Sequence, residues 1–130
     1  MKSPEEIFGP PVFIYSRRQA IEDGEQIDVS RVAAEAGIKF PVFLTRAVFH
    51  RYVEVPAGVT GQDEQGRLWD VVWMLRCAIH AGNGGALIHY QLQVRNNNRA
   101  PKLVTLKAQC GPKDFDDPQP AITIMLPEED

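Results

Sequence analysis

Two tryptophans, an arginine and a histidine recur at helical spacing in the middle of the chain. They stand at positions i, i+4, i+7 and i+11, along one side of an α-helix: Trp69, Trp73, Arg76 and His80. Tryptophan and arginine are enriched among the residues that carry the binding energy of protein interfaces. If it is exposed, this stripe predicts a protein-binding surface. Because tryptophan is highly buried on average, burial of both indoles beneath the N-terminal helices is the competing interpretation.

A second group of polar side chains alternates with apolar ones further along the chain. Every second position is polar, so these side chains share one face of a strand: His89, Gln91, Gln93 and Arg95. The neighbouring predicted strand adds three polar residues to that face: Thr105, Lys107 and Gln109. This array could hydrogen-bond a peptide, a nucleotide or a protein partner. A merely solvated outer face is the other interpretation of the same pattern.

A third set of charged residues could serve an enzyme or a nucleotide-binding protein. The candidate residues for that alternative are Arg46, His50, Asp63, Arg67, Asp70 and Lys107. Asp63 is equally explained as a helix cap, because helix N-termini attract negative charge. The acidic segment 114–117 lacks the spacing of a calcium loop and is followed by prolines, so we predict a solvated loop there.

Motifs typical of familiar enzyme classes are missing. The sequence has no phosphate-binding G-x-x-x-x-G-K-[ST], no dinucleotide-binding G-x-G-x-x-G, no H-E-x-x-H and no G-x-S-x-G. The three histidines are too dispersed to indicate a metal site, and the spacing of Cys77 and Cys110 fits no zinc or redox motif. We therefore predict no catalytic residue, no metal and no cofactor.

The first part of the chain has helical patterns separated by glycine and proline. Helices are predicted over 17–23, over 31–36, from Thr45 onward and over 67–81, with a brief strand near 27–29 and a polar loop over 60–66. Ser16 and Gln19 form a capping box for the first helix. The 67–81 helix is the clearest, because six apolar residues recur at helical spacing: Leu68, Val71, Val72, Leu75, Ala78 and Ile79.

The apolar period changes from 3.6 to 2 beyond residue 86. Strands are predicted over 87–95, 102–110 and 121–126, each with one apolar and one polar face. Helices followed by strands predict a single α+β domain over 1–130, with a helical half (1–82) and a C-terminal β-meander (86–127). The predicted sheet is antiparallel, with three strands and room for a fourth or fifth, and helices pack on one face only.

Length, charge and hydropathy narrow the class of protein. At 130 residues, 44% of them hydrophobic, the chain has the size and composition of one globular domain. A formal net charge of −3 disfavours direct nucleic-acid binding, which usually needs a basic face. No apolar run approaches the roughly 18 residues that span a bilayer, and the N-terminus has no signal-peptide pattern. We expect a cytoplasmic protein with no membrane partner.

Short sequence blocks spread over nearly the whole chain resemble those of a known protein family. They include Ile14-Tyr15-Ser16-Arg17, Gly66-Arg67-Leu68-Trp69-Asp70-Val71, Val104-Thr105-Leu106-Lys107-Ala108 and the C-terminal run 122–130. Together they resemble a small bacterial domain family of unknown function that is found on plasmids, integrative elements and phages. The resemblance implies no activity and no site residues. It implies a genetic context, in which small acidic proteins often modulate host systems such as restriction, CRISPR interference or plasmid maintenance.

Three hypotheses for function follow from these patterns. The first is a binding protein encoded by a mobile element, acting on a protein partner as a non-enzymatic modulator or inhibitor of a host defence complex. The second is a small enzyme or nucleotide-binding protein of unknown substrate. The third is a structural protein that self-associates through an edge strand, for which 121–126 is the candidate. The oligomeric state stays open.

Overall fold

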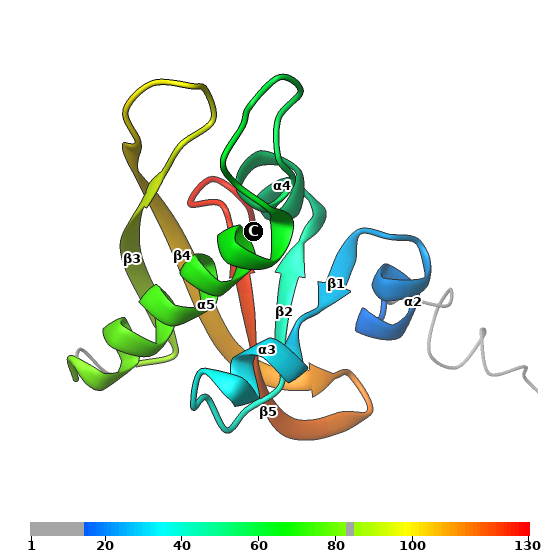
Figure 1. The fold of residues 1–130 in the computed structure, drawn as a ribbon. Coiled ribbons are helices and arrows are strands. Elements are labelled where there is room, and N and C mark those ends of the chain that lie inside the picture. The colour runs from blue at the N-terminus through cyan, green and yellow to red at the C-terminus, as the bar shows by residue number, and fades with distance from the viewer. Residues whose placement is uncertain (1–14, 83–84) are drawn as a thin grey trace, which may run out of the picture.

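The computed structural model of the protein describes residues 15–82 and 85–130. It contains helices and a five-stranded sheet, which confirms the predicted α+β class (Figure 1). The elements in chain order are α2 (Arg17–Glu22), β1 (Gln26–Asp28), α3 (Ser30–Glu35), β2 (Val42–Thr45), α4 (Arg46–Val48), the π-helical turn η1 (Phe49–Val53), α5 (Glu64–His80), β3 (Leu87–Val94), β4 (Lys102–Asp114) and β5 (Asp117–Met125). None of the described helices is long and apolar enough to cross a membrane.

The sheet is mixed, which corrects the prediction of a purely antiparallel sheet. Its strand order is β1-β2-β5-β4-β3. The pairs β3–β4 and β4–β5 are antiparallel, so the predicted C-terminal meander is present. β2 and β5 run parallel, with Val42 opposite Ile122 and Leu44 opposite Ile124. β5 therefore lies at the centre of the sheet, and the hypothesis that 121–126 is an edge strand is wrong. The two edges are β1 and β3.

β2 is absent from the predicted elements because its sequence does not alternate. Val42, Phe43 and Leu44 are each at most 1% exposed, so the strand is buried on both faces. Such a strand is a short apolar run that periodicity alone does not distinguish from part of a helix. Thr45 ends β2 and caps the next helix, since its hydroxyl oxygen accepts a hydrogen bond from the Val48 N–H at 3.4 Å. The predicted helix start at Thr45 is confirmed.

The main hydrophobic core lies between the sheet and the helices α3, α4 and α5 (Figure 1). Val71, Val72 and Leu75 of α5 are fully buried there, as the helical stripe predicts. The predicted apolar sheet face supplies the other side of the core: Tyr90, Leu92, Leu106, Ile122 and Ile124. Ile79 departs from the prediction, because it is 36% exposed near the C-terminal end of α5.

α2 lies on the opposite face of the sheet, which corrects the prediction that all helices cover one face. Phe43 points away from the main core, because its strand neighbours Val42 and Leu44 belong to that core. The Arg17 guanidinium of α2 covers the Phe43 ring at 4.2 Å from the ring centroid. Phe43 is consequently only 1% exposed. A helix of one and a half turns carries too little pattern to show which sheet face it will cover.

Candidate protein-binding surface

The tryptophan stripe lies on α5, whose start is fixed by an aspartate cap. The Asp63 carboxylate accepts a hydrogen bond from the Gly66 backbone N–H at 2.7 Å. α5 therefore begins at Glu64 and not at the predicted Arg67, and the predicted loop 60–66 is correspondingly shorter. The side of α5 that carries Val71 and Leu75 faces the core, which leaves the flank with the stripe outside it.

The two indoles of the stripe are exposed and stacked on each other. Trp69 is 36% exposed and Trp73 is 38% exposed. Their ring centroids are 5.7 Å apart and their planes meet at 17°. The Arg76 guanidinium lies 4.6 Å from the centroid of the Trp73 ring, and His80, one turn further along, is exposed. The indoles are therefore not core residues, while the binding role of the stripe stays a prediction.

This arrangement suits a protein segment with apolar side chains. Each indole is already held by its neighbour, so a partner that covers the pair has few side-chain torsions left to order. The Arg76 guanidinium is also held in place, over the Trp73 ring. Its planar N–H groups can bind a carboxylate or a backbone carbonyl at the rim of such a contact. The stripe thus combines an apolar centre with a polar edge, as protein interfaces do.

The predicted polar sheet face is present as an exposed row on β3, formed by His89, Gln91 and Gln93. The β3–β4 register places Lys107 opposite His89 and Thr105 opposite Gln91. The Lys107 ammonium donates a hydrogen bond to the backbone carbonyl of Glu129, near the C-terminus. Lys107 is thus engaged within the chain, whereas the three β3 side chains face solvent.

Arg95 does not join this row. Its guanidinium donates hydrogen bonds to the backbone carbonyls of Thr60 and Asn97 and to the Asn98 side-chain oxygen, at 2.8 Å for Asn97 and 3.3 Å for Asn98. β3 ends at Val94, so the alternation on which the prediction rests stops before Arg95. Arg95 ties the turn after β3 to the loop that precedes α5.

The stripe and the row lie on different layers of the protein. α5 packs on one face of the sheet (Figure 1), and this face contains Tyr90 and Leu92. His89, Gln91 and Gln93 alternate with them along β3 and therefore point to the other face. The nine residues predicted from the sequence therefore form two separate surfaces, from which Arg95 and Lys107 are partly withdrawn by contacts within the chain.

Arg67 has a structural role that sequence reasoning missed. It is 5% exposed, and its guanidinium donates to the backbone carbonyls of Val53 at 3.1 Å and Arg95 at 2.7 Å, and to the Asn96 side-chain oxygen at 2.6 Å. Burial lowers the pKa of Arg67, and the nearby Arg95 charge lowers it further. The one hint in the sequence is its position four residues before Val71, on the core side of α5.

The charged residues that we considered for an enzyme or nucleotide-binding site do not come together in one site. Asp63, Arg67 and Asp70 line an open hollow of about 650 Å³ beside Trp69. Arg46 and His50 line a different hollow of about 460 Å³. Burial raises the pKa of Asp70, although the Arg67 charge opposes the shift. Within the described ranges, no three His, Cys, Asp or Glu side chains are placed to hold a metal ion.

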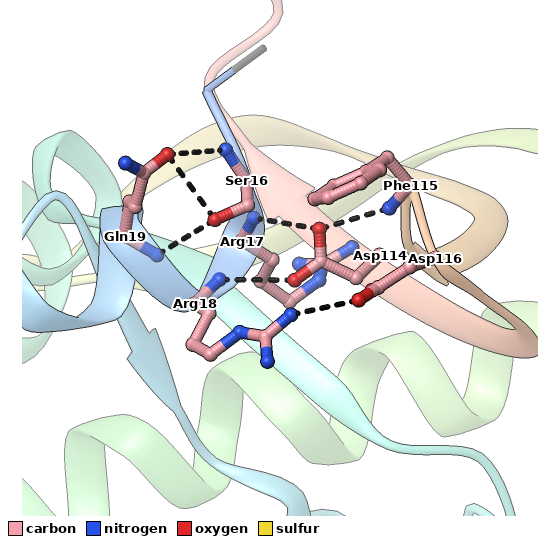
Figure 2. A network of polar contacts seen from close by, with 7 residues as sticks. All are labelled: Ser16, Arg17, Arg18, Gln19, Asp114, Phe115 and Asp116. Carbon is pink, nitrogen blue, oxygen red and sulfur yellow. Dashed lines mark hydrogen bonds and ion pairs between the residues drawn. The ribbon is translucent and has the colours of Figure 1, made fainter.

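The acidic turn between β4 and β5 is exposed at its tip, as predicted, but it is a tight hairpin because the two strands extend to Asp114 and from Asp117 (Figure 2). The Asp114 carboxylate accepts hydrogen bonds from the backbone N–H groups of Arg17 and Arg18 at 3.1 Å each and from that of Phe115 at 2.9 Å. Burial pulls the pKa of Asp114 upward, but the three N–H donors and the Arg18 charge outweigh it and hold the pKa below its usual range. Asp114 thus fixes the N-terminus of α2 to the hairpin.

An ion pair and a capping box also contribute to the contact between α2 and the β4–β5 hairpin (Figure 2). Asp116 pairs with Arg18 at 3.0 Å. The Ser16 hydroxyl oxygen accepts from the Gln19 N–H at 3.1 Å, and the Gln19 side-chain oxygen accepts from the Ser16 N–H at 3.0 Å, which confirms the predicted capping box. These groups anchor α2 on the second face of the sheet.

Comparison with known proteins identifies a family. The model of a family of unknown function (DUF6573) matches residues 10–130. The chain belongs to this family. Because the DUF6573 match includes α5 and the whole sheet, both candidate surfaces lie within the family's domain. Neither the search of curated proteins nor the search of solved structures found a match.

Proposed function

We propose that this protein is a non-enzymatic binding protein that captures a protein partner through the tryptophan stripe of α5. The supporting observation is the exposed, stacked pair of Trp69 and Trp73, with the Arg76 guanidinium over the second ring. The core beneath α5 is built without either indole. Burial of this apolar surface against a partner is favourable, and tryptophan and arginine commonly dominate such contacts.

The chemistry of the stripe favours a partner segment with an apolar anchor and an acidic or carbonyl group beside it. The anchor would lie on the two indoles, and the acceptor would meet Arg76. His80 adds a further polar contact at the C-terminal end of the stripe. The outer row on β3 is the second candidate contact, with amide groups in place of aromatic ones.

We further propose that the partner is a component of a host defence complex in the cytoplasm, and that the chain is encoded by a plasmid, an integrative element or a phage. The support is the resemblance of its sequence blocks to proteins carried on such elements, together with its small size and its net charge of −3. Inhibition would then follow from occupation of a surface on the complex and would need no chemistry.

Affinity capture tests this proposal. The bait proteins are the wild type, the double variant Trp69→Ala/Trp73→Ala and the control Leu103→Ala, which removes a side chain that is 56% exposed on β4, away from the stripe. Wild type and control should retain the same partner from a host that carries defence systems. Each tryptophan removed should weaken the isolated complex by about 2 kcal/mol or more, roughly 30-fold.

Thermal melting of the three baits establishes that each is folded. Capture of no partner by the wild type would contradict the proposal. Equal capture by the double variant would show that a different surface binds.

A further inference from the structure

We infer that two copies of this chain pair edge to edge along β3, so that their sheets join into one continuous sheet. β3 is the last strand in the order β1-β2-β5-β4-β3 and runs for eight residues, Leu87–Val94. Among the described residues, its only strand partner is β4. The opposite edge, β1, is three residues long, so β3 offers much the longer row of backbone groups.

One hydrogen bond fixes which backbone groups of β3 face outward. The Cys110 N–H donates to the Ala86 carbonyl at 2.7 Å, and the register that sets Leu87 opposite Gln109 also sets Ala86 opposite Cys110. Hydrogen-bonded pairs alternate along an antiparallel ladder, so the even-numbered residues of β3 bond to β4. The N–H and C=O groups of the odd-numbered residues Leu87, His89, Gln91 and Gln93 consequently point to the free edge.

This edge lacks the features that keep edge strands apart. Natural sheets protect long edges with lysine, proline, bulges or very short strands. β3 contains no charged residue and no proline, and its register with β4 is continuous from Leu87 to Val94. The β1 edge is protected in two ways, because it is short and carries Asp28. The β3 edge is therefore built to accept another strand.

A second copy fits this edge better than a foreign peptide. A two-fold antiparallel register centred on Gln91 sets it opposite the partner's Gln91 and sets His89 opposite the partner's Gln93. On the inner face it sets Tyr90 opposite the partner's Leu92, so these pairs join side chains of like polarity, and Leu87 lies opposite residue 95, past the end of β3. A register centred on Tyr90 would instead set Leu87 opposite the partner's Gln93.

A domain that selects a foreign strand reads alternate side chains in pockets. The hollow beside the C-terminal half of β3, between Asp70 and Leu92, has a volume of only about 10 Å³ and cannot take a side chain. Pairing with a copy needs no such pocket, because the pairs are supplied by the strand itself.

Mass measurements over a concentration series test the pairing. At high concentration the wild type should reach twice the 14.6 kDa mass of one chain. Gln91→Lys places like charges opposite each other and should weaken association roughly tenfold or more. Gln91→Pro removes an N–H that faces outward, a position where an edge strand tolerates proline, and should also abolish the dimer. Thr105→Lys adds the same charge to the same face one strand inward and should dimerise normally.

Amide hydrogen exchange gives a second readout that does not depend on variants. The N–H groups of Ile88, Tyr90 and Leu92 should be protected at every concentration, because β4 holds them. Those of His89, Gln91 and Gln93 should gain protection only as the dimer forms.

Three results would overturn the inference. The first is a monomeric wild type at sub-millimolar concentration, and the second is a dimer unaffected by both Gln91 variants. The third is protection of the odd-numbered amides that is independent of concentration, since a segment of the same chain would then cover the edge.

Discussion

Replacing Arg67 by alanine should destabilise the protein far more than removal of an arginine from a surface helix. The side chain is 5% exposed and joins α5 to two other parts of the chain, the end of η1 and the turn after β3. Its substitution therefore tests whether these three elements are held together by one buried guanidinium.

The size of this loss depends on which hydrogen-bond donors remain for each acceptor once the Arg67 guanidinium is removed. The Arg95 carbonyl keeps a second donor, the Gln62 side-chain amide at 2.7 Å, and Asn96 is exposed and can be hydrated. Val53 is 1% exposed, so its carbonyl loses its donor inside the protein, at a cost of about 1–3 kcal/mol. Loss of the packed side-chain stem adds to this, and release of a buried charge offsets part of it. We expect a net loss of about 2–4 kcal/mol in the free energy of unfolding.

Urea denaturation followed by far-UV circular dichroism measures this loss. With an m-value of about 1–3 kcal/mol/M, the midpoint should fall by roughly 0.7–4 M. Arg67→Lys should lie between the wild type and Arg67→Ala, because an ammonium cannot reproduce the forked contacts. Arg76→Ala is the control and should cost about 1 kcal/mol or less, since its contact is a surface cation–π pair. A loss below about 0.5 kcal/mol for Arg67→Ala, the range of ordinary surface substitutions, would refute the reasoning.

Two further predictions concern the core and the hairpin contact. Leu75→Ala on α5 and Leu106→Ala on β4, both fully buried, should each lower the free energy of unfolding by about 2–5 kcal/mol, and wild-type melting temperatures for both would contradict the packing described. The pKa of Asp114 is lowered in the folded state, so its stabilisation is complete above the unfolded aspartate pKa of about 3.9 and is lost as pH falls through the folded pKa. Urea midpoints measured between pH 6 and pH 3 should consequently fall less steeply for Asp114→Asn than for the wild type, and parallel curves would show that the contact with α2 does not titrate.

The elements that follow from the sequence are those whose signals are local. The capping box at Ser16 and the alternation in β3 involve residues a few positions apart, and both are present in the structure. β2 lacks such a signal, because its residues are buried on both faces and its parallel partner β5 lies some eighty residues away. The extension of β4 to Asp114 escaped prediction for a related reason, since the prolines and acidic residues of the turn resemble a loop until α2 supplies their partners.

The candidate surface also has a part that local spacing predicts and a part that depends on contacts between distant segments. Helical spacing places Trp69, Trp73 and Arg76 on one flank of α5, and the structure confirms that arrangement. Whether the flank is covered depends on where the small helices pack, and α2 lies on the far face of the sheet where it cannot cover the indoles. Arg95 has the right spacing for the outer row, but its guanidinium is held by the loop before α5, a contact between distant parts of the chain.

The most direct test of the proposed function is fluorine NMR of the protein labelled with fluorotryptophan, with and without its captured partner. Trp69 and Trp73 are the only two tryptophans, so the spectrum should contain two resonances, both sensitive to solvent in the free protein. Saturation with unlabelled partner should shift both resonances and remove their response to solvent. Two resonances that keep their positions and their solvent response in the saturated complex would contradict the claim that the tryptophan stripe is the binding surface.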